Sequence, residues 1–138
     1  MRANLALIVI LTASLVACDS SKKTVSGTIR ILPELQTKIS STAVLYVIAR
    51  PSGQLSGPPV AVKRYVPPFQ FPLAFQLSQE DAMIPDMPFK GELTISARIS
   101  QSGSAMPAAS GDLDSSQGPR QVKVGESGFE MILDRRQN

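Results

Sequence analysis

The chain has 138 residues, of which 43% are hydrophobic and 18% are charged, with 11 prolines and 9 glycines. This length fits one domain with a single core, and the many turn-forming residues favour short elements over long helices. A formal net charge of +3 without a long basic run does not indicate a nucleic-acid partner.

The first eighteen residues have the pattern of a bacterial lipoprotein export signal. Arg2 gives a positive start, an apolar stretch runs over residues 5–16, and Ala17 precedes the only cysteine, Cys18. The apolar stretch is short for a membrane span. Residues 15–18 (LVAC) resemble the lipobox, in which the cysteine sulfur takes a diacylglyceryl group, the signal is cut before the cysteine and the new amine is acylated. The alternative is an uncleaved anchor in which the cysteine is incidental.

We therefore predict a signal peptide over residues 1–17, a lipidated cysteine and tether over 18–24, and a globular domain over 25–134. Two or more acyl chains make membrane anchoring stable, so a triacylated Cys18 needs no transmembrane helix. Asp19 resembles the inner-membrane retention signal of enteric lipoproteins. The expected location is the cell envelope, on the periplasmic side of the inner membrane.

Seven segments have the pattern of short β-strands. Polar and apolar residues alternate in several of them, which is typical of half-buried strands. The nearly continuous run at 42–50 predicts a central strand, and Pro72 predicts an edge strand or a bulge. Together the seven predict an all-β, immunoglobulin-like β-sandwich. The segments are residues 24–32, 42–50, 60–66, 69–78, 91–100, 121–124 and 129–133.

Three finer expectations follow from the same patterns. The large apolar residues of 69–78 are expected to form the densest part of the core. The acidic residues 80–81 are expected to open a single helical turn, because nearby prolines prevent a longer helix. Residues 125–128 (GESG) are expected to join the last two strands in a tight hairpin.

The available side chains argue against an enzyme. The chain contains no histidine, which removes the commonest general base and metal ligand and excludes triads that need an imidazole. With Cys18 lipidated, no thiol remains for nucleophilic chemistry, and no cofactor is expected. One metal alternative stays open: if the proline-rich loops converge, the thioethers of Met83, Met87 and Met106 would bind copper(I). Otherwise these methionines fill irregular gaps.

A long loop follows the strand at 91–100, and loops of this length are usually functional or disordered. Arg98 lies on the polar face of that strand, and Met106 with Pro107 offers an exposed apolar contact. We predict a partner-binding surface that contains Arg98, Met106, Pro107 and Asp112. The alternative is that Met106 packs onto the end of the sandwich while Asp112 caps a turn.

This loop also carries a resemblance to a known family. Residues 97–100, 102–103, 105–107 and 111–113 (ARIS, SG, AMP and GDL), together with 122–128, resemble the C-terminal immunoglobulin-like domain of the cytochrome c-type biogenesis protein H family. The resemblance covers residues 25–134. In that family the domain ends a larger inner-membrane protein with tetratricopeptide repeats that helps to hold apocytochromes c for haem ligation. The repeats have no counterpart in this sequence, so the resemblance implies a membrane-anchored binding or assembly module with a protein partner in the envelope.

Overall fold

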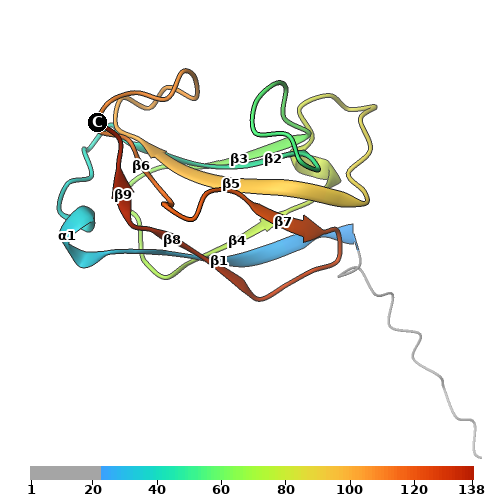
Figure 1. Cartoon of the computed structure of the whole chain (residues 1–138), viewed down its shortest axis with the longest axis horizontal. Helices are drawn as coiled ribbons and strands as arrows, with labels where there is room; N and C mark the ends of the chain where they lie inside the picture. Colours follow the sequence, from blue (N-terminus) through green and yellow to red (C-terminus); the bar gives the residue numbers. More distant parts are fainter. Residues whose placement is uncertain (1–22) are drawn as a thin grey trace, which may run out of the picture.

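The computed structural model describes residues 23–138, which form two β-sheets packed face to face (Figure 1). The predictions for the signal peptide, Cys18 and Asp19 lie outside the described residues. In the described part, no helix is long and apolar enough to cross a membrane. The elements in chain order are β1 (Val25–Ile31), α1 (Pro33–Gln36), β2 (Val44–Pro51), β3 (Ala61–Tyr65), β4 (Leu73–Leu77), the 3-10 helix η2 (Gln79–Asp81), β5 (Glu92–Ser100), β6 (Leu113–Asp114), β7 (Arg120–Lys123), β8 (Phe129–Leu133) and β9 (Arg135–Arg136).

The two sheets differ in size and in the direction of their strands. The smaller has the order β4-β1-β8, in which β1 is antiparallel to β4 and parallel to β8. The larger has the order β3-β2-β5-β6-β9, and β7 also pairs with β5. All pairings in the larger sheet are antiparallel. The all-β sandwich predicted from the sequence is confirmed, as are the central position of β2 and the edge position of β4.

Alternation along the strands places one face of each sheet in a shared core, because successive side chains point to opposite faces. In β1 the inward positions include Gly27, which lies against two aromatic rings. A Cβ atom there would come within 2.6 Å of the carbonyl oxygen of Phe129 and 3.1 Å of the Phe75 ring. The rings of Phe75 and Phe129 meet edge to face, with centroids 5.6 Å apart. Glycine at position 27 therefore allows the two flanking aromatic residues to meet over β1.

The expectation that residues 69–78 form the densest part of the core is wrong. Phe69, Phe71 and Leu73 are only half-buried, and the strand covers Leu73–Leu77 alone. Proline has no N–H to donate to a neighbouring strand, so the prolines at 67, 68 and 72 delay the start of β4. Among the described residues, the largest fully buried aliphatic side chains are instead shared between the two sheets, with two each on β1, β2 and β5 and one each on β4, β6 and β8.

The predicted hairpin between the last two strands is also wrong. β7 pairs with β5 in the larger sheet, whereas β8 pairs with β1 in the smaller one, so residues 124–128 cross from one sheet to the other. Backbone hydrogen bonds to β1 guide this crossing: Ser26 N–H donates to the Glu126 carbonyl, and Gly128 N–H donates to the Ser26 carbonyl, both at 3.1 Å. The single helical turn at residues 80–81 is confirmed as η2, which is closed by a capping box between Ser78 and Asp81.

Candidate functional site

The loop between β5 and β6, residues 101–112, rises above the outer face of the larger sheet (Figure 1). A single carboxylate closes it. Asp112 accepts hydrogen bonds from the backbone N–H of Gln101 and of Ala109, both at 3.0 Å. The side-chain amide of Gln101 donates to the carbonyls of Lys38 and Gly111, which ties the loop to the segment after α1. The geometry of residues 101–112 therefore depends on the Asp112 side chain, which is only 1% exposed.

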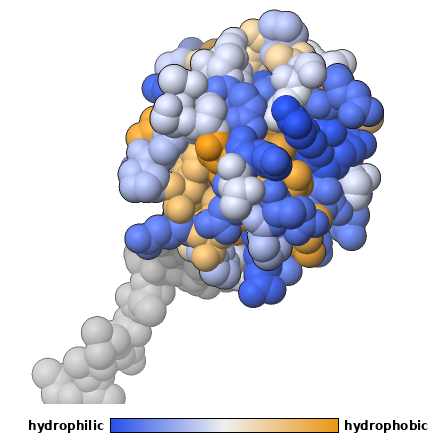
Figure 2. Space-filling view, turned by 90° about the vertical axis from the view of Figure 1, so that its left-hand side faces the viewer, coloured by the Kyte–Doolittle hydropathy of each residue, from blue (hydrophilic) through white to orange (hydrophobic). Residues whose placement is uncertain are grey.

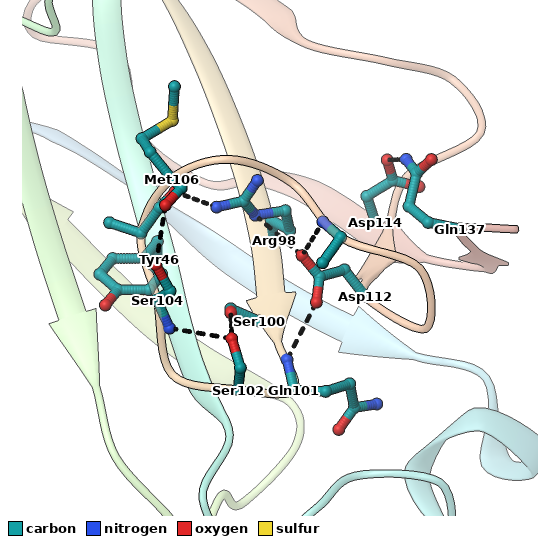
Figure 3. Close-up of polar contacts among 12 residues, drawn as sticks. Tyr46, Arg98, Ser100, Gln101, Ser102, Ser104, Met106, Asp112, Asp114 and Gln137 are labelled. Atoms are coloured by element: carbon teal, nitrogen blue, oxygen red, sulfur yellow. Dashed lines mark hydrogen bonds and ion pairs between the residues drawn. The ribbon is translucent and has the colours of Figure 1, made fainter.

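Arg98 on β5 supplies the charge that such a buried carboxylate requires. Its Nε lies 3.7 Å from Oδ2 of Asp112, and its side chain is 13% exposed. The guanidinium also donates to the carbonyl of Ala105, so it holds the far side of the loop (Figure 3). Nε itself is buried and has no hydrogen-bond acceptor among residues 23–138. Arg98 thus neutralises Asp112 and draws the loop back over the sheet.

The near side of the loop is fixed by an aromatic residue. The hydroxyl of Tyr46 on β2 donates to the Gly103 carbonyl at 2.7 Å. Gly103 has a φ of +83°, and a Cβ there would lie 3.0 Å from the Thr42 carbonyl oxygen, so glycine suits both the backbone and the space. The loop in this way covers part of an apolar cluster on the outer face, formed by Val44, Tyr46, Ile48 and Val62.

The tip of the loop leaves Met106 in solvent. Its side chain is 65% exposed and points away from the polar contacts that fix the loop (Figure 3). The Ser104 hydroxyl donates to the Met106 carbonyl at 2.8 Å, which orders the backbone below it. Seen from the end of the sandwich that bears α1, the surface is largely hydrophilic, with hydrophobic areas between polar side chains (Figure 2). The hydrogen bond of Ser104 thus fixes the backbone of the loop tip, while the side chain of Met106 is exposed to solvent.

A groove of about 300 Å³ lies beside Met106 on the outer face of the larger sheet. The loop that carries Leu55 forms the opposite rim, and Figure 1 shows both loops rising above the sheet. Leu55 is 71% exposed. We call this depression the outer groove; its lining includes Ile48, Arg50, Leu55, Arg98, Met106 and Arg135.

Positive charge dominates the outer groove. Arg135 is held by Asp114, with Nε–Oδ1 and Nη2–Oδ2 distances of 2.8 and 2.9 Å, and this pairing raises the pKa of Arg135. Arg50 has no carboxylate partner among the described residues, and its Nε donates to the Gly57 carbonyl at 3.3 Å. Burial, and then the nearby charge of Arg98, lower the pKa of Arg50. The guanidinium of Arg50 is thus the uncompensated charge of the groove.

With this geometry in place, comparison with known proteins identifies the family. A family profile described as the cytochrome c-type biogenesis protein H Ig-like domain matches residues 25–134. The chain belongs to this family. The match covers the sandwich from β1 to Asp134, the residue between β8 and β9.

A solved structure with a similar fold is described as an alternative pilotin from the type II secretion system of Vibrio cholerae. It is 17% identical to this chain, and the alignment has a TM-score of 0.52 and covers 81% of this chain and 95% of the other. At this identity the likeness concerns the fold alone. Comparison with curated protein sequences gave no match.

Within this family fold, the predicted partner-binding residues lie close together but differ in access. Arg98 and Met106 both line the outer groove, and Pro107 is exposed next to Met106. Asp112 is buried, so it would act on a partner by holding the loop rather than by contact. Met106 does not pack onto the end of the sandwich, whereas Asp112 does bind backbone amides of its own loop.

The three methionines of the copper alternative occupy two different regions. Met83 and Met87 lie in the segment before β5, and Met106 lies in the loop after it. A nine-residue strand spans about 30 Å, and Figure 1 shows the two loops near opposite ends of β5. Met87 packs against the core, whereas Met83 is exposed. Among the described residues, no group of three or more His, Cys, Asp or Glu side chains is placed to hold a metal ion.

Sequence reasoning missed two members of the groove, Arg50 and Leu55. Arg50 ends the 42–50 run, and its outward orientation follows only from knowing that Leu45, Val47 and Ala49 point inward. A large apolar residue in a loop of Ser, Gly and Pro, as Leu55 is, was the available signal. Neither residue could be joined to Arg98 and Met106 without the β2–β5 pairing.

Proposed function

We propose that this protein is a non-catalytic binding and assembly module of the cell envelope. In this proposal a lipid on Cys18 anchors it at the periplasmic side of the inner membrane, where it serves cytochrome c maturation. The family match over residues 25–134 supports a role related to cytochrome c biogenesis. The LVAC stretch at residues 15–18 supports the lipid anchor.

The observation that carries the binding role is the construction of the 101–112 loop. A buried ion pair between Arg98 and Asp112 holds the loop, while Met106 at its tip is left in solvent beside the outer groove. Burying two charges is unfavourable unless they are paired, and apolar residues of similar volume are often at least as stabilising. An arrangement that fixes a loop in this way and displays a flexible apolar side chain suits protein recognition.

The remaining chemistry supports a role without catalysis. The chain has no histidine, and the outer groove is lined by guanidinium and apolar groups. Arginine remains protonated in proteins and binds carboxylates well, but it does not act as a general base near neutral pH. Recognition is therefore the function that the groove supports best.

The test is removal of the protein from the bacterium that encodes it. In a deletion strain, haem staining of membrane and periplasmic fractions is expected to show less holocytochrome c, and the wild-type chain should restore it. A Cys18→Ala variant should be unprocessed or released from the membrane and should restore less. Mass spectrometry of the membrane-bound form should find acyl groups on Cys18.

Two results would count against this proposal in separate ways. If the deletion strain contains as much holocytochrome c as the wild type, the protein has no role in cytochrome c maturation. Crosslinking would then be used to look for a different envelope partner. An unmodified Cys18 in the mature membrane-bound protein would remove the lipid anchor.

A further inference from the structure

We propose that the outer groove binds an acidic segment of a partner protein, in which carboxylates lie next to a large apolar side chain. This inference rests on the proposed binding function and names the chemistry of the partner. Residues of the larger sheet and of two ordered loops line the groove, and Figure 1 shows both loops above that sheet.

The rims of the outer groove are apolar. Leu55 and Met106 are among the most exposed large hydrophobic side chains of the described residues, at 71% and 65%, and both line the same groove. Ile48 lies between them on the floor and is 8% exposed. An apolar side chain inserted above Ile48 would remove both rim residues from water, and the unbranched thioether of Met106 can adapt to its shape.

The charge of the outer groove comes from arginines. Three guanidinium groups line the groove, from Arg50, Arg98 and Arg135, against the single carboxylate of Asp114. Asp114 is bound by Arg135, and the buried Asp112 is paired with Arg98, so of these three arginines only Arg50 lacks a carboxylate partner within the described residues. A guanidinium presents a planar set of donors that matches a carboxylate. The occupant that complements this charge is anionic.

The environment of Arg50 strengthens the same conclusion. Its pKa is lowered by partial burial and by the positive charge of Arg98. Both causes disfavour the charged form of Arg50 when the groove is empty, and a carboxylate from a partner would offset both. A basic segment would be repelled instead, so the positive charge of the groove also disfavours basic partners.

The experiment is site-specific photo-crosslinking of the full-length chain in its native membrane. A benzophenone amino acid replaces Leu55 or Met106 in the groove, or Met83, which is exposed outside it. We expect crosslinks from positions 55 and 106, and not from 83, to one protein segment that contains aspartate or glutamate beside a large apolar residue.

Charge substitutions then test the role of Arg50. Arg50→Glu should reduce the crosslinked product by about tenfold, as expected when a close charge pair becomes repulsive. Arg50→Gln, which keeps a polar side chain, should reduce it by less. Arg64→Glu is the matched control, because Arg64 is exposed and pairs opposite Tyr46 on the same face but does not line the groove. A lysine in place of the partner's carboxylate should restore crosslinking to Arg50→Glu.

Each contrary outcome has a defined meaning. Crosslinks to lipid, to a second copy of this chain or to a segment without carboxylates would overturn the inference while leaving a binding role intact. Equal losses for Arg50→Glu and Arg64→Glu would show long-range attraction rather than recognition in the groove. Capture from position 83 alone would place the interface outside the groove, on the segment before β5. Capture from none of the three positions would overturn both this inference and the proposed binding function.

Discussion

The two faces of the same pair of strands, β2 and β5, serve different purposes. On the inner face, Leu45, Val47 and Ile95 are fully buried among other aliphatic side chains. On the outer face, Ile48 and Tyr46 alternate with them but lie next to arginines and under polar loops. The backbone is shared, so the difference lies entirely in the side chains and in what covers them.

This difference separates stability from recognition. The inner face excludes water by packing two sheets together, and any apolar set of suitable volume would serve that purpose. The outer face needs specific partners for each polar group, because a buried charge or amide without one is costly. Substitutions on the inner face should therefore act on stability alone, while those on the outer face should divide between loop geometry and binding.

The largest expected loss comes from the inner face. Leu45→Ala should lower the free energy of unfolding by about 2–5 kcal/mol, because it removes a fully buried side chain and leaves a cavity. Leu55→Ala makes the same chemical change at a rim position that is 71% exposed, and should stay within about 0.5 kcal/mol. Urea unfolding of the two variants measures both values. Similar losses at the two positions would mean that Leu55 belongs to the core.

The next loss comes from the buried charge on the outer side. Asp112→Asn keeps the shape of the side chain but leaves Arg98 without its counter-charge, and should lower the free energy of unfolding by about 3 kcal/mol. Asp86→Asn is the matched control, since Asp86 is exposed in the segment before β5. Equal melting temperatures for Asp112→Asn and the wild-type chain would show that the loop closes without this ion pair.

Much of the inner face was predictable from sequence, and particular residues show why. Leu93, Ile95, Ala97 and Ile99 alternate with polar residues, and period-2 alternation directly reports which side of a strand is buried. Pro72 likewise reports an edge, because its missing N–H is tolerated there. Both signals are local, so no knowledge of the pairing is required to use them.

The outer face was harder to predict because its members meet only through long-range pairing. Asp112 lies in a polar loop, where a solvated carboxylate is the usual state, and its burial depends on Arg98 on β5 as well as on two backbone N–H groups of its own loop. Residues 125–128 contain two glycines that suit either a hairpin or a crossing between sheets. These residues cross between the sheets because β7 pairs with β5 and β8 pairs with β1.

A smaller loss is expected where the outer face touches its loop. Tyr46→Phe removes the hydrogen bond to the Gly103 carbonyl without changing the ring, and should lower the free energy of unfolding by about 1 kcal/mol. Hydrogen exchange should rise mainly in residues 102–107, because the loop would open more often while the sheet remained paired. Faster exchange throughout β2 and β5 would instead show that the tyrosine stabilises the whole sandwich.

The smallest expected change in stability comes from the tip of the loop, where the effect on binding should be large. Met106→Asp should alter the free energy of unfolding by no more than about 0.5 kcal/mol, because the side chain is 65% exposed. The same substitution at Met131, which is 4% exposed in β8, should prevent stable folding, since it buries a carboxylate in the core. In the groove, the new aspartate removes an apolar contact and places a negative charge beside Arg98, so crosslinking from position 55 should fall. Retained crosslinking with unchanged stability would show that the partner engages the Leu55 rim and Arg50 without the tip of the 101–112 loop.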